Sequence, residues 1–155
     1  MDVDKDHAVQ AIFEKNIYNV TFAAGENGTV DGPITQNVTH GGNCAEVSAT
    51  PNTGYDFAGW TNVSEELKMQ NPLVLTNVTK ATSVSAIFTV HYYTVAFTYS
   101  DGGLISGSTD QIVSYQDIAE AVTAVPNDGY HFVNWTSTKY SIPDGEIGRA
   151  SCRER

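Results

Sequence analysis

Arginine occurs in this 155-residue chain only at positions 149, 153 and 155. Lysine and arginine together number 8 against 18 aspartates and glutamates, so the formal net charge is −10. Nucleic acids and anionic lipid surfaces both reward clustered lysine and arginine, so this composition argues against them as partners. No run of 18 apolar residues occurs either, so we expect no membrane insertion.

Cysteine is as scarce as arginine, with only Cys44 and Cys152 in the chain. Two cysteines do not predict a disulfide framework, and Cys44 reads as a small buried hydrophobe. The sequence has no Cys/His cluster, no His-x-x-x-His pair, no G-x-S-x-G nucleophile elbow and no glycine-rich phosphate loop before a helix. We therefore expect no catalytic residues, no cofactor and no metal site.

One stretch imitates a metal loop. Asp2, Asp4 and Asp6 resemble the start of a calcium-binding EF-hand loop. His7 and Phe13 stand where that loop requires Gly and Glu, so we interpret the stretch as a solvated turn.

What the chain has in place of these features is a block that occurs twice, 75 residues apart, as PNTGYDFAGW at 51–60 and PNDGYHFVNW at 126–135. With residues 16–61 laid on 91–136 without a gap, 16 of the 46 pairs are identical. Residues 3–13 match 78–88 at the same offset. Self-similarity at a fixed period predicts a tandem array.

The offset divides the chain into four segments. Residues 1–15 hold the closing strand of a truncated preceding repeat, 16–90 a complete β repeat and 91–145 a repeat truncated at its C-terminus. Residues 146–155 resemble a common short-read sequencing adapter in translation, so we expect a non-native tail without packed contacts. We expect the strand at 8–13 to be unpaired or docked on an open sheet edge.

Apolar residues alternate with polar ones between turn signals throughout the complete repeat, which is typical of half-buried strands. The predicted strands cover 17–24, 29–31, 34–39, 45–50, 55–61, 73–75 and 83–89. Residues 64–68 are expected to form at most one helical turn with Ser64 as its N-cap. The fold class is therefore all-β, with tandem small domains of about 75 residues, and residues 89–92 predict a semi-rigid connection between them.

The large aromatic residues of the repeated block allow two interpretations. A small unit needs its large rings inside, which places them in the core. Alternation puts Phe57 and Trp60 on opposite faces unless a bulge at Gly59 turns Trp60 inward. In the alternative, Trp60 and Trp135 are exposed as stacking platforms for sugar rings. The predicted core comprises Tyr18, Val20, Phe22, Val47, Tyr55, Phe57, Trp60, Phe88, Phe97, Tyr130, Phe132 and Trp135.

Three motifs, YNVTF at 18–22, GYDFAGW at 54–60 and VSAIF at 84–88, together resemble a divergent internalin-type B repeat, a relative of the Listeria–Bacteroides repeat. The second repeat departs from this pattern at Gln116-Asp117, where Gly-Gly is usual. The resemblance implies a β-grasp-like α+β unit with one short helix as the alternative fold.

The same resemblance implies a function. Such repeats belong to secreted or cell-surface bacterial proteins and serve as stalks, spacers or adhesive arms, with no catalytic residues. The implied partners are neighbouring repeats and, where a repeat is adhesive, a host protein or a glycan.

Overall fold

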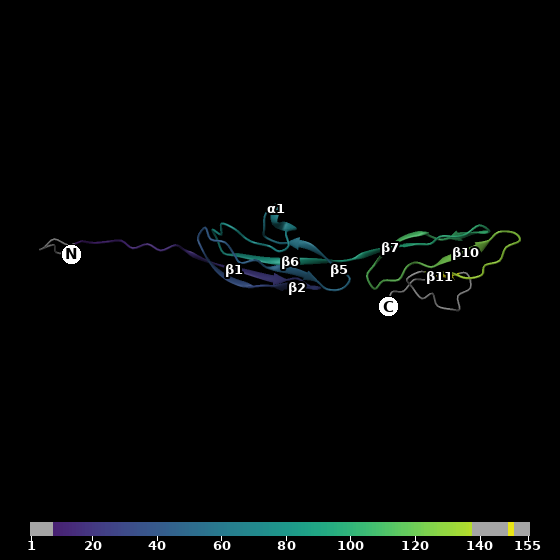
Figure 1. Ribbon diagram of the computed structural model, residues 1–155, viewed down its shortest axis with the longest axis horizontal. Coiled ribbons are helices and arrows are strands. Elements are labelled where there is room, and N and C mark those ends of the chain that lie inside the picture. Colours follow the sequence, from purple (N-terminus) through teal and green to yellow (C-terminus); the bar gives the residue numbers. More distant parts are fainter. Residues whose placement is uncertain (1–7, 138–148, 151–155) are drawn as a thin grey trace. The chain divides into compact units, whose positions relative to one another are not determined.

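The computed structural model describes residues 8–137 and 149–150. Contacts divide the described residues into two compact units (Figure 1). One contains Met1–Thr50 and Phe57–Ile87, and the other Pro51–Asp56 and Phe88–Arg155. Strands predominate in both, and the helix of the described part, α1 (Glu65–Lys68), has only four residues. The all-β class is confirmed.

Residues 17–90 form six strands around α1. They are β1 (Ile17–Ala24), β2 (Gly28–Asp31), β3 (Thr35–Thr39), β4 (Ser48–Pro51), β5 (Tyr55–Trp60) and β6 (Thr82–Val90). Four of them make a sheet in the order β3-β1-β6-β5, and β2 pairs with β4. The central strands β1 and β6 run parallel, whereas β1 and β3 are antiparallel. A mixed sheet with one short helix is what the β-grasp-like alternative described.

The core of the first unit follows from period-two alternation. Val20 and Phe22 of β1 are buried while their neighbours are partly or fully exposed. Val84 and Ala86 of β6 are buried in the same way. Since β1 and β6 are adjacent and in register from Val20↔Thr82 onward, their buried side chains form one continuous apolar face.

One local prediction in this unit is wrong and another holds only in part. Residues 73–75 do not form a strand, and only an isolated bridge joins Leu73 to Val47. Ser64 stands at the N-cap position of α1, but its side chain makes no capping hydrogen bond. A single helical turn leaves few amide groups to cap, and the Leu67 amide donates to the Ser64 carbonyl.

The second unit repeats the same hairpins. Its strands are β7 (Tyr92–Ala96), β8 (Gly103–Ser106), β9 (Asp110–Ser114), β10 (Val122–Pro126) and the short β11 (Arg149–Ala150). β7 pairs with β9 as β1 pairs with β3, and β8 pairs with β10 as β2 pairs with β4. Backbone bonds recur at the same offset: Phe22 N–H donates to Ile34 O at 2.8 Å and Phe97 N–H to Thr109 O at 2.7 Å.

The second unit also differs from the first in its sheet. β1 has 8 residues but β7 has 5, and residues 130–135 form no strand where the first unit has β5. In the described part of the chain nothing corresponds to β6, the strand that β1 and β5 share. The shorter β7 and the absence of a strand at 130–135 both accompany the absence of a described counterpart to β6, because a strand without a neighbour has no partner for its backbone hydrogen bonds.

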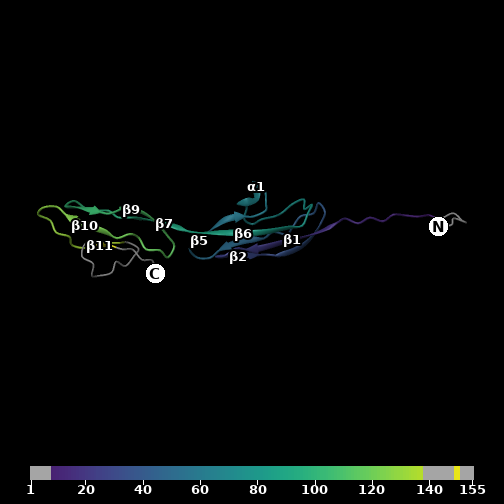
Figure 2. The same cartoon turned by 180° about the vertical axis from the view of Figure 1, so that it is seen from behind.

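Both ends of the chain bear on earlier predictions. The predicted strand at 8–13 is absent, and residues 8–16 lead into β1 without secondary structure (Figures 1 and 2). The expectation that residues 146–155 make no contacts is wrong for Arg149–Ala150, which pair with β10. An open strand edge recruits extended backbone whatever its origin. The other residues of that tail lie outside the described part.

Residues Pro51–Asp56 group with the second unit, which the sequence did not indicate. The His91 amide donates to the Gly54 carbonyl at 2.8 Å, and His91 Nδ1 lies 2.6 Å from Asp56 Oδ2. The rings of Tyr55 and Tyr115 meet edge to face at 6.3 Å. His91 alone separates the end of β6 from the start of β7.

Candidate functional site

The repeated tryptophan block, residues 51–60 and 126–135, is the candidate site, and in the first unit its tryptophan is buried. Trp60 is only 2% exposed at the end of β5. Its ring meets Phe22 edge to face at 6.5 Å and Phe57 at 5.6 Å. Its indole Nε1–H donates to the Gln70 carbonyl at 2.9 Å, so burial leaves no polar atom of this side chain without a partner. Trp60 offers no stacking surface to a sugar.

Gly59 explains how Trp60 reaches the core. Its φ of +125° lies in a region that residues with a side chain rarely adopt. Simple alternation would place Phe57 and Trp60 on opposite faces, yet their rings are in contact. A Cβ on Gly59 would come within 3.0 Å of the Lys68 carbonyl oxygen. The glycine therefore both turns the strand and leaves room for the end of α1.

In the second unit the same rings meet but are less covered. Trp135 contacts Phe97 at 6.2 Å and Phe132 at 5.5 Å, the same pattern as in the first unit. All three rings are only partly buried. The Trp135 Nε1–H is itself buried and has no hydrogen-bond partner among the described residues. The position 75 residues after Gln70 is Gly145, outside the described part.

A groove of about 700 Å³ opens beside these rings in the second unit. Two stretches form most of its wall, residues 94–105 and 130–137. Their counterparts in the first unit are residues 19–30, which run from β1 into β2, and residues 55–62, which contain β5. In that unit β6 lies between β1 and β5. The groove therefore occupies the position that β6 fills in the first unit.

The predicted core residues fall into three groups. Five are buried: Val20, Phe22, Val47, Trp60 and Phe88. Six are partly buried: Tyr18, Tyr55, Phe57, Phe97, Phe132 and Trp135. Tyr130 is 62% exposed, so its assignment to the core is wrong. It lines the groove, and the described residues give it no ring contact like the one that its counterpart Tyr55 makes with Tyr115.

Sequence reasoning missed a pair of structural glutamines. Gln36 Nε2 donates to the carbonyls of Pro33 and Ala45 at 3.0 and 3.1 Å, and its Oε1 accepts from the Ala45 amide at 2.7 Å. Gln111, only 7% exposed, makes the same three bonds with Ser108 and Glu120. The comparison of the two repeats could have revealed these residues, since the same residue type occurs at the equivalent positions 36 and 111.

Groups with reactive or ligating chemistry are dispersed. Across the described residues, no three His, Cys, Asp or Glu side chains are grouped so as to hold a metal ion. Burial raises the pKa of the Cys44 thiol, which keeps it in the unreactive protonated form. The candidate calcium loop at Asp2, Asp4 and Asp6 lies outside the described part. Nor does that part contain a helix with the length and apolar character of a membrane span.

Comparison with known families agrees with the repeat structure. The profile of the divergent InlB B-repeat domain matches residues 18–91 and again residues 93–146. The chain belongs to the divergent InlB B-repeat family. No curated protein and no solved structure was found to match it.

This family assignment confirms the resemblance drawn from the YNVTF, GYDFAGW and VSAIF motifs. A divergent InlB B-repeat indicates a non-catalytic module of a bacterial surface protein. In this B-repeat chain the tryptophan block is an internal packing element, with one sealed copy and one beside an open groove.

Proposed function

We propose that this chain is a stalk or spacer segment of a secreted or cell-surface bacterial protein, extending other parts of that protein away from the cell. The observation that carries the proposal is the burial of Trp60, whose ring and indole N–H are both used inside the unit. Because the Trp60 ring and its N–H are both occupied inside the unit, this side chain is not available to bind a ligand.

The connection between the repeats and the surface charge support the same function. A single residue, His91, joins β6 to β7, so the repeats are linked by nearly continuous extended backbone. Short non-glycine connections favour semi-rigid spacing over free hinging. The excess of acidic residues favours the solubility of a spacer.

An adhesive arm that binds a glycan or a host protein is the second candidate. Tyr99 and Tyr130, respectively 60% and 62% exposed, line the groove of the second unit beside Trp135. Exposed rings around a groove are typical of sugar-binding sites. The first unit, whose matching position holds β6, has its tryptophan sealed.

Small-angle scattering of the full chain, extrapolated to zero concentration, tests the spacer. A compact globule of this length has a radius of gyration of about 15 Å. The spacer function predicts a clearly larger value, and a value near that of a globule contradicts it.

A glycan array then separates the two candidates. A spacer shows no specific retention on the array. Binding that Trp135→Ala abolishes, while circular dichroism shows the β structure intact, would support the adhesive arm. Trp60→Phe is the matched control, because that ring is buried and its replacement should not affect a surface site.

A further inference from the structure

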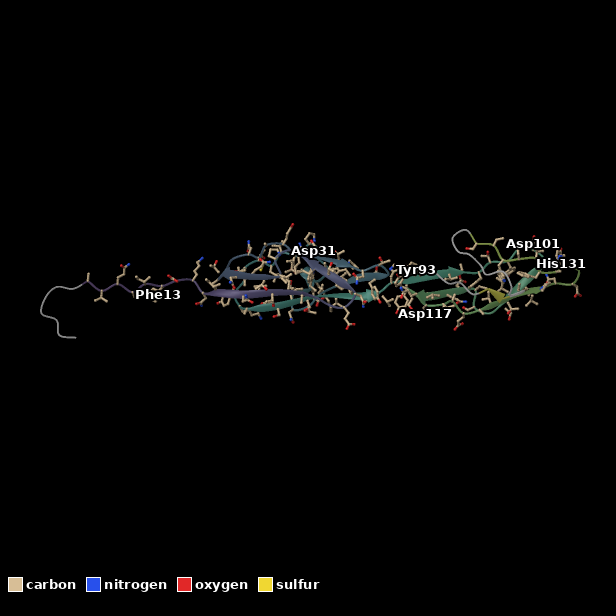
Figure 3. All side chains as sticks on the ribbon, turned by 90° about the horizontal axis from the view of Figure 1, so that it is seen from below. Phe13, Asp31, Tyr93, Asp101, Asp117 and His131 are labelled. Carbon is tan, nitrogen blue, oxygen red and sulfur yellow. The ribbon has the colours of Figure 1, made fainter. Side chains whose placement is uncertain are left out.

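The described part of the chain carries sulfur at two positions, Cys44 and Met69 (Figure 3). The Cys44 thiol is buried, and because burial raises its pKa it stays in the unreactive protonated form. Met69 has the opposite surroundings, since its side chain is 61% exposed. A thioether reacts with an oxidant without first losing a proton, so access decides whether it reacts. Of the two sulfur atoms, the one in Met69 is open to reagents in solution.

Met69 ends α1 and lies against the glycine that turns β5 (Figure 1). Its Sδ is 3.3 Å from the position that a Cβ on Gly59 would take, and the Lys68 carbonyl oxygen is 3.0 Å from the same position. Because glycine has no side chain, the thioether lies directly on the backbone of β5. The side chain of Met69 is thus mostly exposed, while its sulfur contacts the strand.

The turn that contains Met69 also carries the hydrogen-bond acceptor of the buried tryptophan. The Gln70 amide donates to the Leu67 carbonyl at 3.0 Å and closes the turn. The Gln70 carbonyl accepts the indole N–H of Trp60 at 2.9 Å. The turn therefore contacts two successive residues of β5, Gly59 through the Met69 sulfur and Trp60 through the Gln70 carbonyl.

We propose that Met69 is an oxidation site, at which hydrogen peroxide converts the thioether to a sulfoxide and loosens the turn that holds Trp60. A lone pair of the sulfur attacks one oxygen of the peroxide, and the O–O bond breaks. The leaving hydroxide takes up the proton of the transferred oxygen and becomes water. The sulfur is oxidised by two electrons and the peroxide is reduced by two. This chemistry is the same whether the chain serves as a spacer or as an adhesive arm.

The sulfoxide no longer suits the contact with Gly59. Oxidation turns an apolar side chain into a polar one whose new oxygen requires a hydrogen-bond donor. The nearest polar atom to that contact, the Lys68 carbonyl oxygen, can only accept. Water is the available donor, so the oxidised side chain should leave Gly59 and turn toward solvent. No residue of α1 is buried, so few other contacts hold the turn in place.

Peroxide treatment of the folded full chain in a Trp135→Phe background tests the proposal, because Trp60 is then the sole tryptophan. Peptide mapping by mass spectrometry should find one added oxygen on Met69, at a rate close to that in denatured protein. The emission of Trp60 should shift to the red, and acrylamide should quench it more strongly. The methionine sulfoxide reductases, one for each sulfoxide epimer, should reverse both changes.

Two variants in the same background separate Met69 from other oxidisable groups. Met69→Leu keeps an apolar side chain of similar volume but has no sulfur, so peroxide should leave the Trp60 emission of this variant unchanged. Met69→Gln introduces a polar side chain and should show the red shift without peroxide. Glu66→Gln, an exposed change in α1, is the matched control and should resemble the parent chain.

Three results would overturn the proposal. The first is oxidation of Met69 that is much slower in folded than in denatured protein, because the sulfur would then be inaccessible. The second is complete oxidation of Met69 with unchanged Trp60 emission. The third is an equal emission shift in peroxide-treated Met69→Leu, which would assign the change to another group.

Discussion

At the scale of single residues, the two tryptophans occupy equivalent positions but have unequal surroundings. Trp60 is sealed by Phe22, Phe57 and the Gln70 carbonyl. Trp135 has the two matching ring contacts but lacks a described acceptor for its N–H. Identical residues therefore contribute differently to the stability of the two units.

Truncating each tryptophan measures that difference. Trp60→Ala should lower the free energy of unfolding of the first unit by about 3–5 kcal/mol, the usual cost of removing a buried aromatic side chain. Trp135→Ala should cost the second unit clearly less, because its ring is only partly covered. Urea denaturation of both variants provides the comparison, and equal losses would show that the two surroundings do not differ as described.

The thiol of Cys44 provides a second prediction at this scale. Burial raises its pKa, so in a Cys152→Ser background it should react with a disulfide reagent at neutral pH only when the protein unfolds. Because the folded pKa lies above the unfolded one, the protonated thiol stabilises the fold below about pH 8.5, and that stabilisation is lost as pH rises through the folded pKa. Labelling as fast as in denatured protein would contradict its burial.

At the scale of elements, the two glutamine side chains hold the loop after each β3-type strand. Gln111→Glu removes the Nε2 donor while keeping the size of the side chain, so the Ser108 and Glu120 carbonyls lose their partner. We expect a loss of about 1–3 kcal/mol in the second unit, from buried groups left unsatisfied. Thermal unfolding of Gln111→Glu and Gln36→Glu checks this. The neighbouring exposed Ile112→Thr is the control and should cost little.

Hydrogen exchange compares the same strand segment in the two units. The amide groups of residues 22–24 lie in a strand between β3 and β6, whereas residues 97–99 belong to no strand. The Phe22 amide faces Ile34, so by alternation the Ala23 amide faces β6. In dilute protein the amide of 98 should therefore exchange much faster than that of 23. Phe97 is the internal control, since its amide donates to Thr109 and should be protected. Similar protection of both segments would mean that the second edge of β7 is already paired.

The sequence predicted those features that depend on neighbouring residues, and it did not predict those that depend on contacts with residues far along the chain. Alternation located β1 at 17–24, because one buried face imposes the period on its own residues. It failed at Tyr130, because the ring against which its counterpart Tyr55 packs is Tyr115 of the following repeat, and the described residues bring no such ring to Tyr130. The Gln36 bonds also escaped prediction, since their partners at 33 and 45 are fixed by loop geometry and not by a pattern of residues.

At the scale of the whole molecule, two units of unequal completeness should unfold separately. Calorimetry should show two transitions, the lower belonging to the second unit, whose described residues include no strand corresponding to β6. One cooperative transition in all samples would contradict this description.

The proposed spacer role depends most on the claim that Trp60 packs inside its own unit and does not face a ligand. In a Trp135→Phe variant Trp60 is the sole tryptophan, so acrylamide quenching of its fluorescence reports its exposure directly. We predict blue-shifted emission that acrylamide barely quenches until denaturant unfolds the first unit. Emission from the folded protein that acrylamide quenches as readily as free tryptophan would contradict the claim, and with it the proposed role as a spacer.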